Sequence, residues 1–220
     1  MKAVVVASGD LADADLRELA DADVVVAADG GAAVLQPAGH PIDLLVGDLD
    51  SATPALVARL EAAGTRVERH PIDKEASDTE LALRAAIEAG ATEVVVLAAT
   101  GGERLDHELA NVLLLADPAL AAVDVRLLRG DTVVRVVRGG ESLAIDVPPG
   151  GIVSLLPIGG DAAGVSTAGL RWALDRATLR VGPSRGLSNR VIGRPAAVRI
   201  ERGALLVIET VDRTDRKDIP

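Results

Sequence analysis

The strongest constraint on the fold lies in the first 123 residues, where short apolar runs alternate with segments of helical periodicity. Most of these runs are uniformly apolar and rich in valine, so neither face of the sheet they form can be exposed to water. Together with the short connections, this predicts a parallel sheet covered by helices on both sides. We therefore predict an α/β fold whose residues 1–123 form an N-terminal, Rossmann-like parallel-sheet domain. The expected strands lie at residues 3–7, 24–28, 44–46, 65–70 and 93–98.

The segments between these runs carry helix signals. Thr53 is a good N-cap residue, Pro54 suits the first helical position, and Gly64 suits the position after the last turn. The sequence Ser-Asp-Thr-Glu at 77–80 has the form of a capping box. Helices are expected at residues 11–20, 32–36, 54–63, 78–89 and 106–116.

After residue 123 the pattern changes to closely spaced β-rich runs, separated by turns that contain glycine and proline. This spacing is typical of a sandwich or a barrel. The sequence Glu-Arg-Gly at 201–203 indicates a hairpin between the last two runs. We predict an all-β domain at residues 124–210 and a charged tail at 211–220. The runs lie at residues 125–128, 132–137, 142–147, 152–157, 164–167, 170–174, 177–181, 196–200 and 204–208.

Composition excludes several classes of function. The formal net charge of −10 argues against nucleic acid as a partner, because phosphate backbones are bound by clustered Lys and Arg. It suits a small substrate, especially a cationic one, or a metal-bound phosphate. The absence of cysteine excludes disulfides, zinc–thiolate sites and a thiol nucleophile. The first apolar run is too short for a signal peptide or a membrane span, so we expect a cytoplasmic protein with no membrane partner.

Residues 43–50, with the sequence DLLVGDLD, place two carboxylates directly after an expected strand. If the backbone stays extended there, Asp48 and Asp50 point the same way. Two close carboxylates repel each other unless a cation lies between them, and such oxygens suit Mg²⁺, which takes its other ligands from water and phosphate. The alternative is a solvated turn, because Gly-Asp and Asp-Ser are common turn dipeptides.

Charged residues follow four of the expected strands in the same way. Because parallel strands end at the same edge of a sheet, and ligands of such sheets bind there, we expect these side chains to converge on one site. Carboxylates hold Mg²⁺, Lys and Arg neutralise phosphoryl charge, and glycines let backbone N–H groups approach phosphate. This predicts a site for a metal-bound nucleotide, although the chain has neither a P-loop nor a GxGxxG motif. The residues are Asp29, Asp48, Asp50, Asp73, Lys74, Asp78, Arg104, Asp106 and His107.

Several motifs occur in a fixed order along the chain. They are GDLDS at 47–51, HP at 70–71 with KEASD at 74–78, GGERLDH at 101–107, Trp172, and GLSN at 186–189. Together they resemble the motifs of the thiamine pyrophosphokinase family. The resemblance implies an α/β catalytic domain, a C-terminal β-sandwich and a homodimer. It also implies transfer of the pyrophosphoryl group of ATP to the hydroxyl of thiamine, with release of AMP and use of Mg²⁺.

On this resemblance, Asp48, Asp50 and Asp78 are expected to bind Mg²⁺ and to act in catalysis, with Asp29 as a further ligand or a neighbour of the ligands. An acidic residue in a first helical turn, as Asp78 would be, also compensates the helix dipole, and both interpretations stay open. Lys74 is expected to contact phosphate of ATP, although a lone lysine usually lies at the surface.

Arg104 is expected to hold a phosphate oxygen through two parallel hydrogen bonds. Asp106 is expected to bind metal or to accept the proton of the attacking hydroxyl, or else to be an N-cap residue. His107 is expected to orient a phosphate or the ribose, with a structural role as the alternative. Phosphoryl transfer depends on positioning and electrostatics, so a strong base is not required.

Trp172 is the one tryptophan of a chain that has no Phe and no Tyr, so packing does not require a large ring. Core packing is the ordinary role of a lone tryptophan. We expect Trp172 instead to stack on the cationic ring of thiamine, an attraction of about 0.5–2 kcal/mol. Ser188 and Asn189 are expected to donate or accept hydrogen bonds with the substrate, or to form a tight turn after Gly186.

Two other functions stay open. One is a pyrophosphokinase for another heterocyclic alcohol, such as a hydroxymethyl-pterin, against which Trp172 and the Ser-Asn pair argue. The other is a non-catalytic nucleotide sensor, against which the full set of charged residues at the expected site argues.

Overall fold

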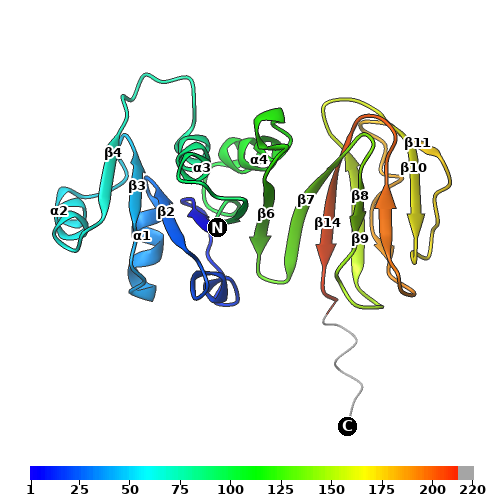
Figure 1. Ribbon diagram of the computed structural model, residues 1–220, viewed down its shortest axis with the longest axis horizontal. Helices are drawn as coiled ribbons and strands as arrows, with labels where there is room; N and C mark the ends of the chain where they lie inside the picture. The colour runs from blue at the N-terminus through cyan, green and yellow to red at the C-terminus, as the bar shows by residue number, and fades with distance from the viewer. Residues whose placement is uncertain (213–220) are drawn as a thin grey trace, which may run out of the picture. The chain divides into compact units, whose positions relative to one another are not determined.

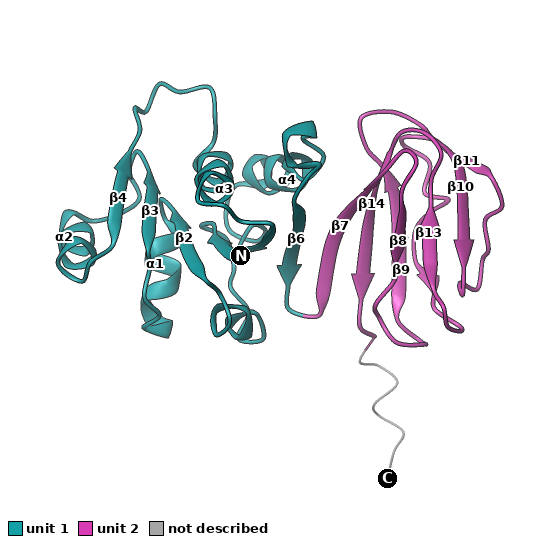
Figure 2. Ribbon diagram, viewed as in Figure 1, with its two compact units in different colours: residues 1–130 teal, residues 131–220 magenta. Residues whose placement is uncertain are grey.

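The structure is a computed structural model and describes residues 1–212. The chain divides into two compact units, residues 1–130 and the part from Asp131 onward (Figure 2). The boundary lies after residue 130 and not after residue 123, because residues 124–129 form a strand that pairs in parallel with residues 93–96 of the first sheet. Most of the expected tail, from residue 213 onward, lies outside the described residues.

The first unit is built on a parallel sheet, which confirms the expected arrangement of strands (Figure 1). Its strands are β1 (Lys2–Val6), β2 (Val24–Ala28), β3 (Leu44–Gly47), β4 (Arg66–Arg69), β5 (Glu93–Leu97) and β6 (Asp124–Arg129). They lie in the order β6-β5-β1-β2-β3-β4. Valines, alanines and leucines of β1, β2, β3 and β5 are buried almost throughout, whereas β4 at the edge carries charged side chains. In this strand order, β1 lies between β5 and β2.

Helices and 3₁₀ turns connect these strands. Two of the expected N-caps are confirmed, because Thr53 Oγ1 accepts the Leu56 N–H and Ser77 Oγ accepts the Glu80 N–H, each at 3.2 Å. The helices are α1 (Gly31–Leu35), α2 (Pro54–Ala62), α3 (Asp78–Glu88) and α4 (Leu105–Leu114), with 3₁₀ turns η1 (Asp15–Leu19), η2 (Gln36–Ala38) and η3 (Pro118–Leu120).

The helix expected over residues 11–20 is wrong in kind and in length, since only η1 forms there. Asp15 is the cause: its side chain is buried and accepts the N–H groups of Ala12 at 3.2 Å and Gly130 at 2.8 Å. These bonds hold the segment against the end of β6 and give its backbone an alternative to a regular helix.

The second unit, over residues 131–212, contains two antiparallel sheets (Figure 1). One has the order β12-β9-β14-β7 and the other β11-β10-β13-β8. Aliphatic residues of both antiparallel sheets form one buried cluster. It includes Leu155 and Leu205 of the sheet that contains β9 and β14, and Val165 and Val198 of the sheet that contains β10 and β13. The strands are β7 (Thr132–Arg138), β8 (Ser142–Ala144), β9 (Ile152–Pro157), β10 (Ala162–Ala168), β11 (Ala177–Leu179), β12 (Asn189–Arg190), β13 (Ala197–Arg199) and β14 (Ala204–Thr210).

Two local expectations in this unit are wrong. Residues 201–203 do not form a hairpin, because β13 and β14 pair with strands of different sheets and the turn crosses between them. The run at 170–174 contributes an isolated bridge between Leu170 and Val191 instead of a strand. Both segments are β-rich, as the local pattern predicts, but the strand with which each one pairs depends on distant residues.

Within the described part of the chain, no helix has both the length and the apolar character needed to cross a membrane.

Candidate active site

A cavity of about 380 Å³ lies at the carboxyl end of the parallel sheet in the first unit. Strand order explains its position. The chain goes from β1 to β2 in one direction along the sheet and from β5 to β6 in the other, so strand order reverses between β1 and β5. Open α/β sheets bind ligands at such a point. The residues that line the cavity are Ser8, Gly9, Ala28, Asp29, Asp48, Asp50, Ser51, Ser77, Asp78, Thr79, Ala99, Gly101, Gly102, Glu103, Arg104, His107, Glu108 and Asn111.

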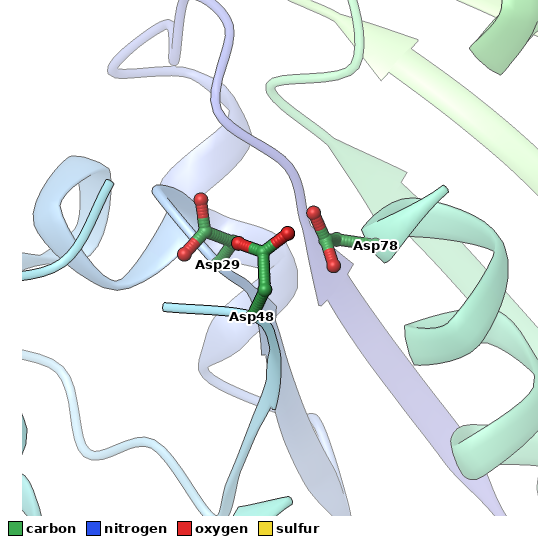
Figure 3. A group of neighbouring side chains, drawn as sticks. All are labelled: Asp29, Asp48 and Asp78. Carbon is green, nitrogen blue, oxygen red and sulfur yellow. The ribbon is translucent and has the colours of Figure 1, made fainter. Parts of the chain in front are cut away.

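Three carboxylates converge in this cavity (Figure 3). Asp29 follows β2, Asp48 follows β3, and Asp78 is the first residue of α3. One oxygen of each lies within 4.8 Å of the others. Among the described residues, the buried Oδ1 of Asp29 has no hydrogen-bond partner. A set of close oxygen ligands with one uncompensated buried oxygen fits a divalent cation such as Mg²⁺.

The charges in this group perturb one another. Burial raises the pKa of Asp29, and the negative charges of Asp78, Asp50 and Asp48 raise it further, with the nearby Ser51 hydroxyl opposing them. A buried carboxylate among like charges is unfavourable by itself, which is the arrangement that a bound cation relieves.

Lys74 supplies the positive charge nearest to this group. Its Nζ lies 2.8 Å from Asp48 Oδ2 and 3.1 Å from Asp78 Oδ1. Its hydrogen bond lowers the pKa of Asp48. Burial alone would lower the pKa of Lys74, but the bonds to Asp48 and Asp78 outweigh this and raise it. Lys74 is expected to contact phosphate. Its ammonium group lies between two carboxylates that line the cavity, although Lys74 itself is not a lining residue.

The backbone after β3 is not extended, so the condition under which Asp48 and Asp50 were expected to point the same way is not met. Leu49 between them has φ 64°, in the left-handed region. The Asp50 N–H instead bonds Asp48 Oδ1 at 3.2 Å, and Asp50 Oδ1 accepts Ser51 Oγ–H at 3.0 Å. Asp50 still lines the cavity, but Asp29 and not Asp50 completes the group of three.

Glycine is required at the end of β3. Gly47 has φ 149°, and a Cβ there would lie 2.9 Å from Asp29 Cβ and 3.0 Å from Asp78 Oδ1. Any other residue would push these side chains apart. The motif glycine before Asp48 therefore allows the close approach of the three carboxylates.

Residues around the start of α4 form another wall of the cavity. Arg104 and His107 line it, whereas Asp106 does not. Arg104 and Asp106 form two parallel bonds, with Nε–Oδ1 at 2.9 Å and Nη2–Oδ2 at 2.6 Å. This pair holds the pKa of Asp106 far below its usual range, so Asp106 is a poor proton acceptor while the pair is intact. Arg104 and not Asp106 is the N-cap residue of α4, which corrects that alternative.

Some lining residues were not expected. Ser8 and Gly9 follow β1, just as the expected site residues follow the other strands. Their position directly after a strand was therefore the signal for them. A Cβ on Gly9 would lie 2.4 Å from the Thr100 carbonyl oxygen, so only glycine fits between these two connections. Asn111 lies one helical turn after His107 on α4, and its Nδ2 donates to the Ala99 carbonyl at 2.9 Å. Helical spacing from His107 was the signal for Asn111.

The other three expected residues lie in the second unit. Trp172 is 56% exposed, which excludes the core-packing alternative, and the Arg171 guanidinium lies 5.2 Å from the centroid of its ring. Ser188 has φ 57° and its N–H donates to Ser154 Oγ at 3.0 Å. Asn189 is buried, and its side chain bonds the main chain of Trp172 instead of facing outward.

Comparisons with known proteins cover both units. A family model described as "Thiamin pyrophosphokinase, catalytic domain" matches residues 16–127, and one described as "Thiamin pyrophosphokinase, vitamin B1 binding domain" matches residues 142–206. Thiamine pyrophosphokinase from Bacillus subtilis (strain 168) is 26% identical over 188 residues, 85% of this chain and 87% of that protein. Thiamine pyrophosphokinase 2 from Oryza sativa subsp. japonica is 26% identical over 175 residues, 76% of this chain and 64% of that protein.

Solved structures agree with these matches. A thiamin pyrophosphokinase family protein from Enterococcus faecalis superimposes with a TM-score of 0.84 at 26% identity, covering 97% of this chain and 100% of that one. Thiamin pyrophosphokinase from Candida albicans superimposes with a TM-score of 0.82 over 96% of this chain and 89% of that one, and at 16% identity it supports the fold alone. Because the two family models together match most of the sequence, and the three carboxylates of the cavity lie within the region matched by the catalytic model, this chain belongs to the thiamine pyrophosphokinase family.

Proposed function

We propose that this protein transfers the pyrophosphoryl group of ATP to the hydroxyl of thiamine, which gives thiamine diphosphate and AMP. The observation that carries the proposal is the group of Asp29, Asp48 and Asp78 at the carboxyl end of a parallel sheet, with Lys74 against it. Membership of the family and the match along 87% of the Bacillus subtilis relative support it.

We propose Asp29, Asp48 and Asp78 as the ligands of Mg²⁺, with Asp50 as a further ligand or a neighbour of the ligands. The short distances among the three carboxylates and the unpartnered Asp29 Oδ1, within the described residues, support this choice. When bound, Mg²⁺ supplies positive charge to the phosphate oxygens of ATP and orients them. In this arrangement the dipole of α3 also favours the charge of Asp78, so the two interpretations of that residue are compatible.

The chain's own residues position the phosphates. The hydroxyl oxygen of thiamine forms a bond to the β-phosphorus of ATP, the bond from that phosphorus to the α-phosphate oxygen breaks, and AMP leaves with this oxygen. We propose that Lys74 and Arg104 neutralise charge on the phosphates during this exchange and that His107 orients a phosphate or the ribose. For Arg104 this means release from Asp106, and the freed Asp106 then becomes available to accept the hydroxyl proton.

We propose that the second unit binds thiamine through the exposed ring of Trp172. The match of residues 142–206 to the vitamin B1 binding model supports this assignment. An exposed indole attracts the cationic thiazolium ring by about 0.5–2 kcal/mol. Ser188 lies in the same motif and has an exposed side chain, so it is the proposed hydrogen-bonding residue. We also propose a Rossmann-like catalytic domain and a β-sandwich, on the order of the parallel strands and the buried cluster shared by the two antiparallel sheets.

We propose that the protein is a homodimer. Leu105, Leu109 and Leu113 lie one turn apart on α4 and are 67%, 55% and 57% exposed in the described chain. An exposed row of three leucines is unusual for a monomer and suits contact with a second copy. Location in the cytoplasm stays a prediction from the sequence.

The reaction itself tests the proposal. Purified protein is incubated with ATP, Mg²⁺ and thiamine, and the products are separated and identified by mass. AMP and thiamine diphosphate in equal amounts are expected, and the Asp48→Asn variant should form neither at a comparable rate. A hydroxymethyl-pterin in place of thiamine tests the alternative substrate. Nucleotide binding without any AMP would instead favour a sensor.

A further inference from the structure

The side chain of Asn189 is buried and bonds the main chain. The residue is 7% exposed. Its Nδ2 donates to the Trp172 carbonyl at 2.8 Å, and its Oδ1 accepts the Trp172 N–H at 3.0 Å and the Arg190 N–H at 2.9 Å. One amide therefore binds both main-chain polar groups of Trp172, as a neighbouring strand would.

The main chain of Asn189 is held independently. Asn189 and Arg190 form β12, which pairs with β9. On its other side this segment receives the loop that carries the indole, because Arg171 N–H donates to the Arg190 carbonyl at 2.9 Å and Leu170 pairs with Val191. The amide of Asn189 extends this pairing by one residue, to Trp172. It thus connects the loop to a sheet that is fixed by many other bonds.

Trp172 itself has little else to hold it. The residue is more than half exposed, and the ring contact found among the described residues is with Arg171, which is also exposed. A stacking surface is useful only if its orientation is fixed before the ligand arrives, since otherwise ordering the ring opposes binding. The two bonds from Asn189 fix the main chain from which the indole projects.

We propose that Asn189 is a positioning residue that acts through Trp172 and does not itself contact the substrate. The proposal rests on the proposed function, in which the indole stacks on thiamine. It differs from the expectation that Asn189 hydrogen-bonds thiamine directly, and it leaves Ser188 as the residue of that motif with an exposed side chain.

The test uses Asn189→Ala in the wild-type protein and in the Trp172→Leu variant. In the wild-type background the substitution should raise the KM for thiamine about 10-fold, within the range of a cation–π contact, and leave the KM for ATP within about twofold. In the Trp172→Leu background it should change the KM for thiamine by less than about twofold, because a residue that acts only through the indole has nothing left to position.

Fluorescence gives a second measurement that does not depend on activity. Trp172 is the one tryptophan of a chain without tyrosine, so the emission comes from this ring alone. Asn189→Ala should add a fast component to its anisotropy decay without ligand. Thr167→Val is the matched control, since Thr167 Oγ1 accepts the Leu174 N–H at 2.9 Å and so holds the same loop without touching Trp172. It should change neither the decay nor the KM for thiamine.

Three results would overturn the proposal: an equal rise in the KM for thiamine in both backgrounds, which indicates direct contact; an unchanged anisotropy decay; or an effect of Thr167→Val as large as that of Asn189→Ala. If the wild-type protein forms no AMP with thiamine, the proposed function fails, and the anisotropy decay alone decides whether Asn189 holds Trp172.

Discussion

Substitution of Asp29 by asparagine should stabilise the first unit while it removes Mg²⁺ binding. Asp29 is buried, its Oδ1 has no hydrogen-bond partner within residues 1–212, and like charges surround it. Asparagine has nearly the same shape without the charge. It also tolerates the left-handed backbone of this position, where φ is 43°, so the substitution adds no backbone strain.

The size of the gain in stability follows from the buried charge that the substitution removes. Asparagine keeps a polar atom at this position, so what is relieved is the buried negative charge among like charges. An uncompensated buried polar group costs about 1–3 kcal/mol and more if it is charged, so we take a gain of about this size. One kcal/mol shifts Tm by about 2–4 °C in a protein of this size, so Asp29→Asn should raise the Tm of the Mg²⁺-free first unit by about 2–12 °C. The variant would then be more stable than the wild type but would no longer bind Mg²⁺.

The rise in Tm caused by Asp29→Asn should depend on pH. Because folding raises the pKa of Asp29 above its ordinary 3.8, the folded state binds this proton more tightly, and the stability it contributes is fully present below pH 3.8. That contribution is lost as pH rises through the raised pKa of the folded protein. The difference in Tm between Asp29→Asn and the wild type should therefore be small at acid pH and full at neutral pH.

Scanning calorimetry with and without millimolar Mg²⁺ measures both effects. Mg²⁺ should raise the Tm of the wild-type protein by mass action and leave that of Asp29→Asn almost unchanged. Asp50→Asn is the matched control, since Asp50 lines the same cavity but is exposed and bonded to Ser51. The reasoning is refuted if Asp29→Asn lowers the Tm without Mg²⁺ at neutral pH, or if Asp50→Asn stabilises as much.

Three further predictions concern other parts of the chain. Lys74→Gln should lower kcat/KM for AMP release by about 10²–10³-fold, the loss typical of a missing charge donor, and a rate close to wild type would exclude a role beyond holding Asp48. Glu209→Gln should lower the free energy of unfolding in urea by about 3–5 kcal/mol, because the buried carboxylate is paired with Arg135; a loss below about 1 kcal/mol would contradict this. Leu109→Glu should convert a dimer to a monomer in sedimentation velocity, and a wild-type protein that already sediments as a monomer would refute the proposed homodimer.

The sequence by itself determined strands β1 to β5 and the α-helices of the first unit, and the edge at which they present charge. Uniformly apolar runs can be buried only inside a covered parallel sheet, and parallel strands must end at one edge, so Asp29, Asp48 and Asp78 had to lie near one another. The caps at Thr53 and Ser77 were also readable, because a cap depends on residues three positions apart.

Tertiary structure alone decided which groups meet. The residue between Asp48 and Asp50, Leu49, is left-handed, and Asp29 and not Asp50 completes the group of three; one dihedral angle of this kind leaves no periodic signal. The crossing at residues 201–203 depends on which distant strands pair with β13 and β14. Asn189 was expected at the substrate because its residue type suits hydrogen bonding, but its direction depends on β9 and on the loop of Trp172. Side-chain direction and strand partnership arise from contacts between distant segments, and so local patterns do not contain them.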